Sequence, residues 1–135
     1  MRPVSTGGFL KLVLFYMREN WRSINGFKGR YQISNYGRVK SLKRYVKNGR
    51  SYRIVPELIL SPGVNEYGYL YVCLSKENRL YPRRVSRLVA IAFLNNWRKL
   101  PEVNHKDGNK SNNRVNNLEW CTAKENSIHA YKTTA

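Results

Sequence analysis

The sequence predicts an α+β protein in which a small N-terminal antiparallel β region and a helix pack on a C-terminal β-β-α unit. Three observations predict this class. After Met17 the chain consists of short β-forming segments separated by Gly and Asn turn signals. Residues 83–97 change to the three-to-four-residue spacing of an amphipathic helix. Residues 101–132 then follow the order short strand, Asn-rich loop, short strand, helix.

The N-terminal β region is defined by its turns. Asn25-Gly26, Lys28-Gly29 and Asn35-Tyr36-Gly37 are combinations typical of tight turns, because Asn and Gly tolerate backbone angles that other residues avoid. The strands predicted around these turns are Tyr31–Ser34, Arg38–Leu42 and Glu57–Leu60.

A hairpin is predicted next. Tyr67–Ser75 alternates bulky and small side chains at period two, and Arg79–Val85 returns after the Lys76-Glu77-Asn78 turn. Pro82 lacks a backbone N–H, so it places the second hairpin strand at the edge of its sheet.

The helix predicted over Arg83–Trp97 has one apolar face and a basic N-terminal end. Arg83, Arg84 and Arg87 lie where the helix dipole favours an anion. Two interpretations stay open for these arginines: a solvated charged face, or contacts to a phosphate group. The residues expected on the buried face are Val85, Leu88, Val89, Ile91, Ala92 and Leu94.

The C-terminal unit comprises a strand over Glu102–His105, a second strand over Leu118–Thr122 and a helix over Ala123–Lys132. Thr122 followed by Glu125 has the spacing of a capping box at the helix start. The apolar residues of the unit are too few for independent folding, so we expect them to pack on the preceding helix. They are Val103, Val115, Leu118, Trp120 and Ile128.

The net charge indicates the partner. Twenty-five Lys and Arg stand against eight Asp and Glu, which gives a formal charge of +17. A compact state with this charge repels itself, and binding to a polyanion removes the repulsion, so nucleic acid is the expected partner. Asp107 is the single Asp, which excludes a site built on two Asp residues. Cys73 and Cys121, the two cysteines, exclude a four-cysteine zinc site.

No segment of the sequence predicts membrane insertion or export. The apolar run Phe9–Met17 is too short to span a bilayer and is interrupted by Lys11. One Arg precedes the run and no small-x-small cleavage site follows it, which makes a poor signal peptide. We therefore expect a cytoplasmic protein with no membrane partner.

Residues 101–130, PEVNHKDGNKSNNRVNNLEWCTAKENSIHA, resemble the ββα-metal (His-Me finger) motif of HNH endonucleases, especially the phage and homing branch. The family's strand-end His, middle Asn and helical polar residue correspond to His105, Asn117 and Asn126. Residues 21–42, WRSINGFKGRYQISNYGRVKSL, resemble the small modular DNA-binding motif that is often fused to these nucleases.

The resemblance implies a division of the chain. Residues 1–16 are expected to be an N-terminal extension, with Met17 as an alternative start. Residues 17–62 are expected to form the modular DNA-binding β motif, and residues 63–135 the HNH nuclease domain, with its ββα core at 101–132.

The resemblance also implies roles for individual residues. His105 would be the general base, and Asn117 would bond across the loop so that His105 is aimed. Asn104 and Asn126 would hold one divalent metal ion, Mg²⁺ or Mn²⁺, by their side-chain oxygens. Many family members have Asp at the position of Asn104, so weak metal binding completed by substrate phosphate is expected here. His129 is a secondary candidate, three residues beyond Asn126 on roughly the same helix face.

Double-stranded DNA is the expected partner, contacted by Arg38, Lys40, Lys43, Arg44, Arg83, Arg84 and Arg87. The leading hypothesis is a divalent-metal-dependent DNA endonuclease encoded by a phage or mobile element and acting in a bacterial host cell, with no small-molecule cofactor. Two alternatives stay open: a catalytically degenerate DNA-binding protein, and a basic RNA-binding protein. The spaced set of His105, Asn117 and Asn126 favours the nuclease.

Overall fold

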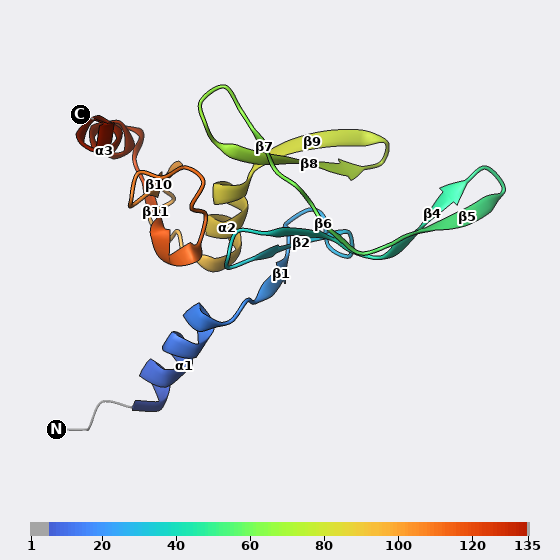
Figure 1. Ribbon diagram of the computed structural model, residues 1–135, viewed down its shortest axis with the longest axis horizontal. Helices are drawn as coiled ribbons and strands as arrows, with labels where there is room; N and C mark the ends of the chain where they lie inside the picture. The colour runs from blue at the N-terminus through green and yellow to red at the C-terminus, as the bar shows by residue number, and fades with distance from the viewer. Residues whose placement is uncertain (1–5, 135) are drawn as a thin grey trace.

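The computed structural model describes residues 6–134, and over this range it is a mixed α+β protein of three α-helices and four small antiparallel sheets (Figure 1). The α+β class is confirmed. Residues 1–5 of the predicted N-terminal extension, and residue 135, lie outside the described residues.

The largest sheet has four strands in the order β1 (Trp21–Ser23), β2 (Tyr31–Ser34), β3 (Val39–Ser41) and β6 (Leu58–Ile59). β2 has the predicted bounds, whereas β3 and β6 are shorter than predicted. β1 was not predicted, because it is a three-residue edge strand without a buried face. The β2–β3 turn contains Gly37 at φ 87°, a conformation that favours glycine.

A two-stranded hairpin, β4 (Arg44–Asn48) with β5 (Ser51–Val55), extends away from the rest of the molecule (Figure 1). We call this hairpin the β4–β5 arm. The sequence analysis missed this hairpin, although Asn48-Gly49 between two segments with Tyr, Val and Ile is a hairpin signal. No residue of the arm is fully buried. Tyr45 and Tyr52 are both about two-thirds exposed.

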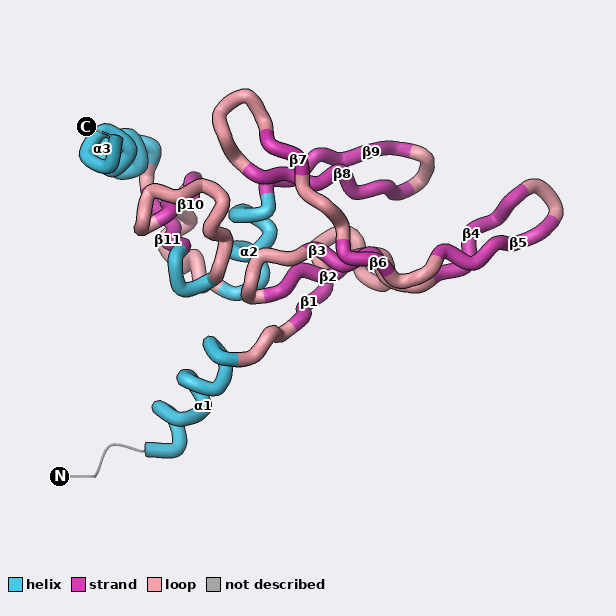
Figure 2. The backbone as a smooth tube through the Cα atoms, viewed as in Figure 1, coloured by secondary structure: helices cyan, strands magenta, loops and turns pink. Residues whose placement is uncertain are grey.

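The third sheet contains β7 (Gly63–Val64), β8 (Leu70–Lys76) and β9 (Arg79–Arg84), in that order. The predicted hairpin is therefore confirmed, with β9 at the edge where Pro82 required it. Helix α2 (Val85–Phe93) begins directly after β9 and lies next to β2, β8 and the C-terminal strands (Figure 2).

Helix α2 is shorter than the predicted Arg83–Trp97, because Leu94 already has extended backbone angles (φ −110°, ψ 128°). Val85, Leu88 and Val89 are buried as predicted. Ile91 was wrongly assigned to the buried face, since it is 51% exposed. One hydrophobic cluster joins α2 to Ile33, Val39, Leu74, Val103 and Leu118, so both halves of the chain share a single core.

The C-terminal unit is β10 (Glu102–His105), a 3₁₀ turn η1 (Val115–Asn117), β11 (Leu118–Cys121) and α3 (Ala123–Thr134). Strands β10 and β11 pair antiparallel, with Asn104 opposite Glu119. The capping box is confirmed: the Glu125 N–H donates to Thr122 Oγ1 at 3.1 Å, and the Thr122 N–H donates to Glu125 Oε1 at 3.4 Å. The unit packs on α2 as predicted, except that Ile128 is 46% exposed and does not belong to the core.

Helix α1 (Thr6–Met17) projects from the start of β1 at the N-terminal end of the molecule (Figure 1). Its apolar side chains Phe9, Leu10, Leu12, Leu14 and Met17 are exposed. Among residues 6–134, every helix falls short of the length and apolar character that crossing a bilayer requires. Cys73 and Cys121 are both free thiols.

Candidate active site

His105 lies at the end of β10 with only 5% of its surface exposed. Its ring Nε2 is 2.8 Å from Asn113 Oδ1, and the Tyr69 ring lies 6.0 Å away between centroids. Because the amide oxygen is an acceptor, this contact assigns the ring proton to Nε2 and leaves the lone pair on Nδ1. Nδ1 makes no hydrogen bond to any residue in the described part of the chain, so it is available to accept a proton.

The surroundings of His105 favour its neutral form. Burial is the main cause of a lowered pKa, and the nearby charge of Lys110 lowers the pKa further. The hydrogen bond to Asn113 and the charge of Asp107 oppose this shift without reversing it. A lowered pKa keeps the imidazole uncharged at neutral pH, which is the form that a general base requires.

Asn113 is a site residue that the sequence analysis missed. It lies in the loop 106–114, among several Asn residues whose ordinary role is to cap turns, as Asn109 and Asn112 do here. Asn113 differs from these two because it is 4% exposed and faces the ring of His105. The sequence offers no signal that separates it from its neighbours.

Asn117 closes the same loop. Its amide nitrogen donates to Asp107 Oδ1 and to the Asn112 carbonyl, both at 2.9 Å. Its amide oxygen accepts from the Asp107 N–H at 3.1 Å. Asn117 therefore bonds across the loop, as the resemblance implies, but the residue that contacts the ring of His105 is Asn113.

Asn104 and Asn126 are each held by a carboxylate. The Asn104 amide nitrogen donates to Glu119 Oε1 at 2.9 Å, and the Asn126 amide nitrogen donates to Glu102 Oε2 at 2.7 Å. Both contacts use the nitrogen, so both amide oxygens stay available as ligands. Glu102 and Glu119 were not identified from the sequence, although strand alternation puts Glu102 on the same face as Asn104.

The face of β10 and β11 that carries Asn104 is acidic, in a protein that is otherwise strongly basic. The acidic charge affects the thiol of Cys121. The pKa of Cys121 is raised to about 11, first by burial and then by the charges of Glu102, Glu125 and Glu119. A negative potential of this kind attracts a cation.

The donors at this face fit a hard divalent cation. Amide and carboxylate oxygens are the ligands that Mg²⁺ takes in proteins. Among residues 6–134, however, no three His, Cys, Asp or Glu side chains are grouped so that they could hold a metal ion by themselves.

His129, the secondary candidate, lies on α3 next to the end of β10. Its Nε2 is 3.1 Å from the backbone oxygen of His105, which ties α3 to the end of β10. It also lines a small cavity of about 290 Å³ together with Asn104 and Glu119.

A cationic groove of about 700 Å³ opens next to Asn126. The Arg84 guanidinium lies 4.1 Å from the centroid of the Tyr69 ring, and Lys110 Nζ lies 4.6 Å from it. Lys110 was not identified from the sequence. We call this the basic groove; its lining includes Tyr67, Tyr69, Arg84, Arg87, Lys110 and Asn126.

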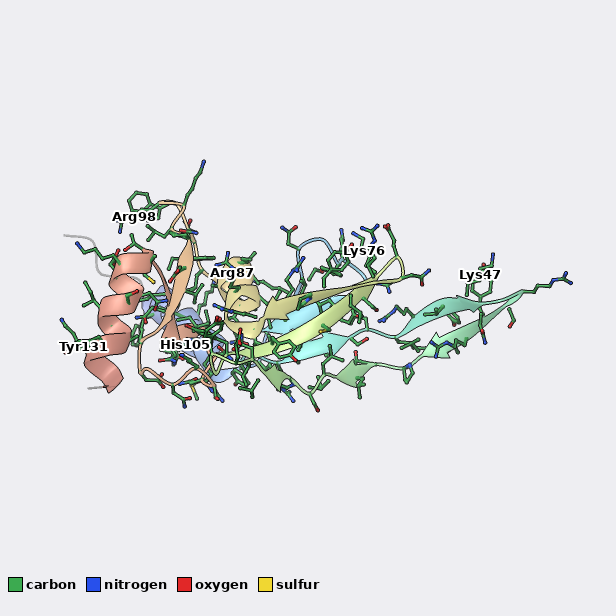
Figure 3. All side chains as sticks on the ribbon, turned by 90° about the horizontal axis from the view of Figure 1, so that it is seen from above. Lys47, Lys76, Arg87, Arg98, His105 and Tyr131 are labelled. Carbon is green, nitrogen blue, oxygen red and sulfur yellow. The ribbon has the colours of Figure 1, made fainter. Side chains whose placement is uncertain are left out.

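Arg83 and Arg87 extend the basic surface around α2. Arg87 donates to the Pro101 carbonyl at 2.8 Å, so its guanidinium is fixed at the groove. Arg83 is exposed and lines a second depression, of about 990 Å³, together with Lys28. In Figure 3 the labelled His105 and Arg87 lie toward the α3 end of the molecule, and Lys47 lies toward the tip of the β4–β5 arm.

The predicted DNA contacts of the N-terminal sheet also have intramolecular partners. Arg38 forms a bidentate ion pair with Glu19, and Lys40 Nζ lies 3.9 Å from the centroid of the Trp21 ring. Arg44 donates to Ser41 Oγ at 2.9 Å. Lys43 is exposed and makes no hydrogen bond or ion pair with the residues that the structure describes.

Comparison with known proteins identifies two motifs in this chain. The family model of the NUMOD4 motif matches residues 19–75, and that of HNH endonucleases matches residues 83–128. The chain is 38% identical over 106 residues to DNA endonuclease I-HmuI of Bacillus phage SP01, covering 78% of this chain and 54% of that protein. It is 42% identical over 87 residues to the uncharacterized HNH endonuclease L245 of Acanthamoeba polyphaga mimivirus, covering 64% and 26%.

Two further comparisons point the same way. The SPbeta prophage-derived putative HNH homing endonuclease YosQ of Bacillus subtilis is 40% identical over 91 residues, covering 67% of this chain and 47% of YosQ. A solved structure described as DNA binding and cleavage by the HNH homing endonuclease I-HmuI superposes with a TM-score of 0.67 at 33% identity, covering 85% of this chain and 59% of that one. This chain spans from about a quarter to just over half of the length of these curated relatives. It carries an HNH endonuclease motif and an N-terminal NUMOD4 motif, and is related to the homing endonuclease I-HmuI and to other phage and viral HNH endonucleases.

Proposed function

We propose that this chain forms the nuclease part of a DNA endonuclease that hydrolyses phosphodiester bonds with the help of one divalent metal ion. The observation that carries the proposal is the state of His105: a buried imidazole with Nε2 held by Asn113, Nδ1 free and a lowered pKa. It lies one residue from Asn104, at the end of the strand that carries the acidic face. The similarity to I-HmuI, whose solved structure is described as DNA binding and cleavage, supports the same reaction class.

In this proposal His105 accepts, at Nδ1, a proton from the water that attacks the phosphorus atom. Asn104 and Asn126 would hold the metal ion through their amide oxygens, and Glu119 and Glu102 keep those amides oriented by holding their nitrogens. When bound, the ion would polarise the scissile phosphate and neutralise the charge on the leaving 3′ oxygen. Asn117 keeps the loop closed beneath His105.

Double-stranded DNA would lie along the basic surface. Arg84, Arg87 and Lys110 would contact phosphates next to the reacting centre, and the N-terminal sheet would contact the flanking duplex. The β4–β5 arm adds exposed cations, Lys47, Arg50 and Arg53, and a two-stranded β-ribbon has the width of a DNA major groove. We expect the gene to belong to a phage or mobile element and the protein to act in the cytoplasm of a bacterial host; the phage and prophage relatives support this.

Plasmid nicking with Mg²⁺ or Mn²⁺, with and without EDTA, tests the proposal directly. A nuclease converts supercoiled plasmid to nicked or linear DNA, and EDTA prevents this. A degenerate DNA-binding protein would shift the plasmid in a gel without cutting it, and an RNA-binding protein would prefer RNA to duplex DNA in competition. Failure to cut with either metal would reject the endonuclease proposal for this chain.

Affinity for duplex DNA should fall steeply as salt rises, because binding releases the counterions condensed on phosphates. The motivation is the formal charge of +17. A plot of log affinity against log salt should be linear, with a slope of magnitude about 0.9 for each phosphate neutralised. Fluorescence anisotropy with a labelled duplex measures the slope, and a slope near zero would argue against DNA as the partner.

Metal binding should be weak in the free protein and tighter in the presence of DNA. The two proposed ligands are neutral amides, and Mg²⁺ prefers to complete its shell with waters and phosphate oxygens. Calorimetric titration of Mg²⁺ into a cleavage-deficient His105→Ala variant, with and without DNA, measures the difference. Asn104→Asp should strengthen binding to the free protein. Tight stoichiometric binding without DNA would show instead that Glu102 and Glu119 ligate the ion directly.

A further inference from the structure

The β2–β3 turn of the NUMOD4 motif is in direct contact with the loop that carries Asn113. The Val115 N–H donates to the Asn35 carbonyl at 2.9 Å, and the Arg114 guanidinium lies 4.2 Å from the centroid of the Tyr36 ring. These contacts join residues about 80 positions apart in the sequence. Asn35 and Val115 are buried, so this contact lies in the protein interior and not at its surface.

This contact leaves no space for a side chain at Gly37. A Cβ atom at Gly37 would lie 2.8 Å from Asn113 Cβ, 2.9 Å from the Asn113 carbonyl oxygen and 3.1 Å from the carbonyl carbon. Two of these three atoms belong to the backbone, which a rotamer change cannot move. The turn therefore touches the backbone of Asn113 at a point with no room for a methyl group.

Asn113 links Gly37 to His105, because it lies against both residues. Its Cβ faces Gly37, and its amide oxygen is 2.8 Å from His105 Nε2. Asn113 and His105 are both buried, so a displacement of Asn113 is not relieved by moving the side chain into solvent. Gly37, Asn113 and His105 thus form a continuous line of contacts from the NUMOD4 motif to the HNH motif.

We propose that Gly37 is a positioning residue for His105: the turn of the NUMOD4 motif holds Asn113 in the place where its amide oxygen fixes the orientation and tautomer of the imidazole. The inference rests on the proposed function, because it concerns the base of that reaction. In this inference the N-terminal motif positions His105 in addition to contacting DNA. The motif completes the nuclease site, and the site is correctly formed only when the turn is seated against residue 113.

A matched pair of glycine variants tests the steric part of this inference. Gly37 and Gly29 have φ values of 87° and 81°, so Ala at either position suffers the same backbone strain. A Cβ at Gly29 meets nothing within 4 Å, whereas a Cβ at Gly37 meets Asn113. Any difference between Gly37→Ala and Gly29→Ala therefore reports the contact with Asn113.

With saturating DNA, cleavage by Gly37→Ala should fall about 10- to 100-fold, the scale expected when a catalytic group is misplaced by a fraction of an ångström to one ångström. Cleavage by Gly29→Ala should stay near the wild-type rate. The DNA dissociation constants of both variants should match the wild type, because neither change removes a cation. Equal cleavage rates for the two variants would overturn the inference.

The imidazole ¹⁵N shifts give a readout that does not depend on cleavage. The chain has two histidines, so His129 serves as an internal reference. In ¹⁵N-histidine-labelled protein at one alkaline pH, without metal or DNA, His105 should show the Nε2–H tautomer in the wild type and in Gly29→Ala. Gly37→Ala should change the His105 pattern and leave that of His129 unchanged. If the wild type failed to cut DNA, the proposed function would be lost, but this experiment would still decide the positioning inference.

If Gly37→Ala does not fold, Asn113→Ala tests the same inference. It removes the amide and leaves the turn in place, so it should reproduce the loss of cleavage and the change in the His105 pattern. In the double variant, Gly37→Ala should add little further loss, because both changes act through the same amide. Wild-type cleavage and an unchanged His105 pattern in Asn113→Ala would overturn the inference, since the amide is the link that it requires.

Discussion

His105→Ala should lower DNA cleavage by about 10²- to 10⁴-fold, the loss typical of removing a general base. The change deletes the proton acceptor and leaves the amides of Asn104 and Asn126 and the basic groove in place. DNA affinity should therefore hardly change. Single-turnover plasmid cleavage and anisotropy on the same preparations measure the two quantities separately.

His129→Ala is the matched control, because it removes the other imidazole of the chain. His129 Nε2 contacts the backbone oxygen of His105, so its loss should reduce cleavage much less. Added metal should not rescue His105→Ala, since a metal ion does not replace a proton acceptor at Nδ1. If His105→Ala cut plasmid at the wild-type rate, the nuclease activity would have to be assigned elsewhere and the DNA-binding alternative would gain support.

Asn126→Ala should reduce cleavage by at least about 100-fold, and excess Mn²⁺ should restore part of the activity. The change removes one of the two amide oxygens proposed to hold the ion and leaves the carboxylate of Glu102 without its amide donor. Loss of partners that orient metal ligands already costs about 10- to 100-fold, and loss of a ligand should cost no less. A titration of cleavage rate against Mn²⁺ concentration measures the rescue.

Asn116→Ala provides the control for this substitution. Asn116 is exposed in η1 and has no side-chain hydrogen bond to the described residues. It should cut DNA at the wild-type rate with an unchanged metal requirement. If Asn126→Ala retained full activity at low Mg²⁺, Asn126 would not be a ligand, and its bond to Glu102 would be a structural tie between α3 and β10.

The elements that bury a face could be predicted from the sequence. The pairing of β8 with β9, helix α2 and the β10–β11–α3 order all follow from periodicity, turn residues and a capping box. The β4–β5 arm was missed because it buries no complete face, although its Asn48-Gly49 turn and its Tyr, Val and Ile residues are signals of a hairpin. The end of α2 was misplaced for a related reason: apolar Leu94 continues the helical spacing, although the chain there is already extended.

The candidate site was predictable only in part. His105, Asn117 and Asn126 could be located because they match a spaced family motif, and the roles assigned to them stay predictions. Asn113, Glu102 and Glu119 could not, since each acts through a partner that only folding brings near. Glu119 meets Asn104 across the β10–β11 ladder, 15 residues away in sequence. Contacts of this kind depend on register, which composition and spacing do not specify.

The shared core has a consequence for how such nucleases exchange parts. Ile33 and Val39 of the NUMOD4 motif lie in one hydrophobic cluster with Val89 of α2 and Leu118 of β11. A recombination event that replaced the N-terminal motif would therefore replace part of the hydrophobic core of the nuclease as well as the surface proposed to contact DNA. The recombined protein would fold only if the side chains of the incoming motif had volumes complementary to those of α2 and β11. Packing in the shared core therefore restricts which N-terminal motifs can be combined with a given nuclease motif.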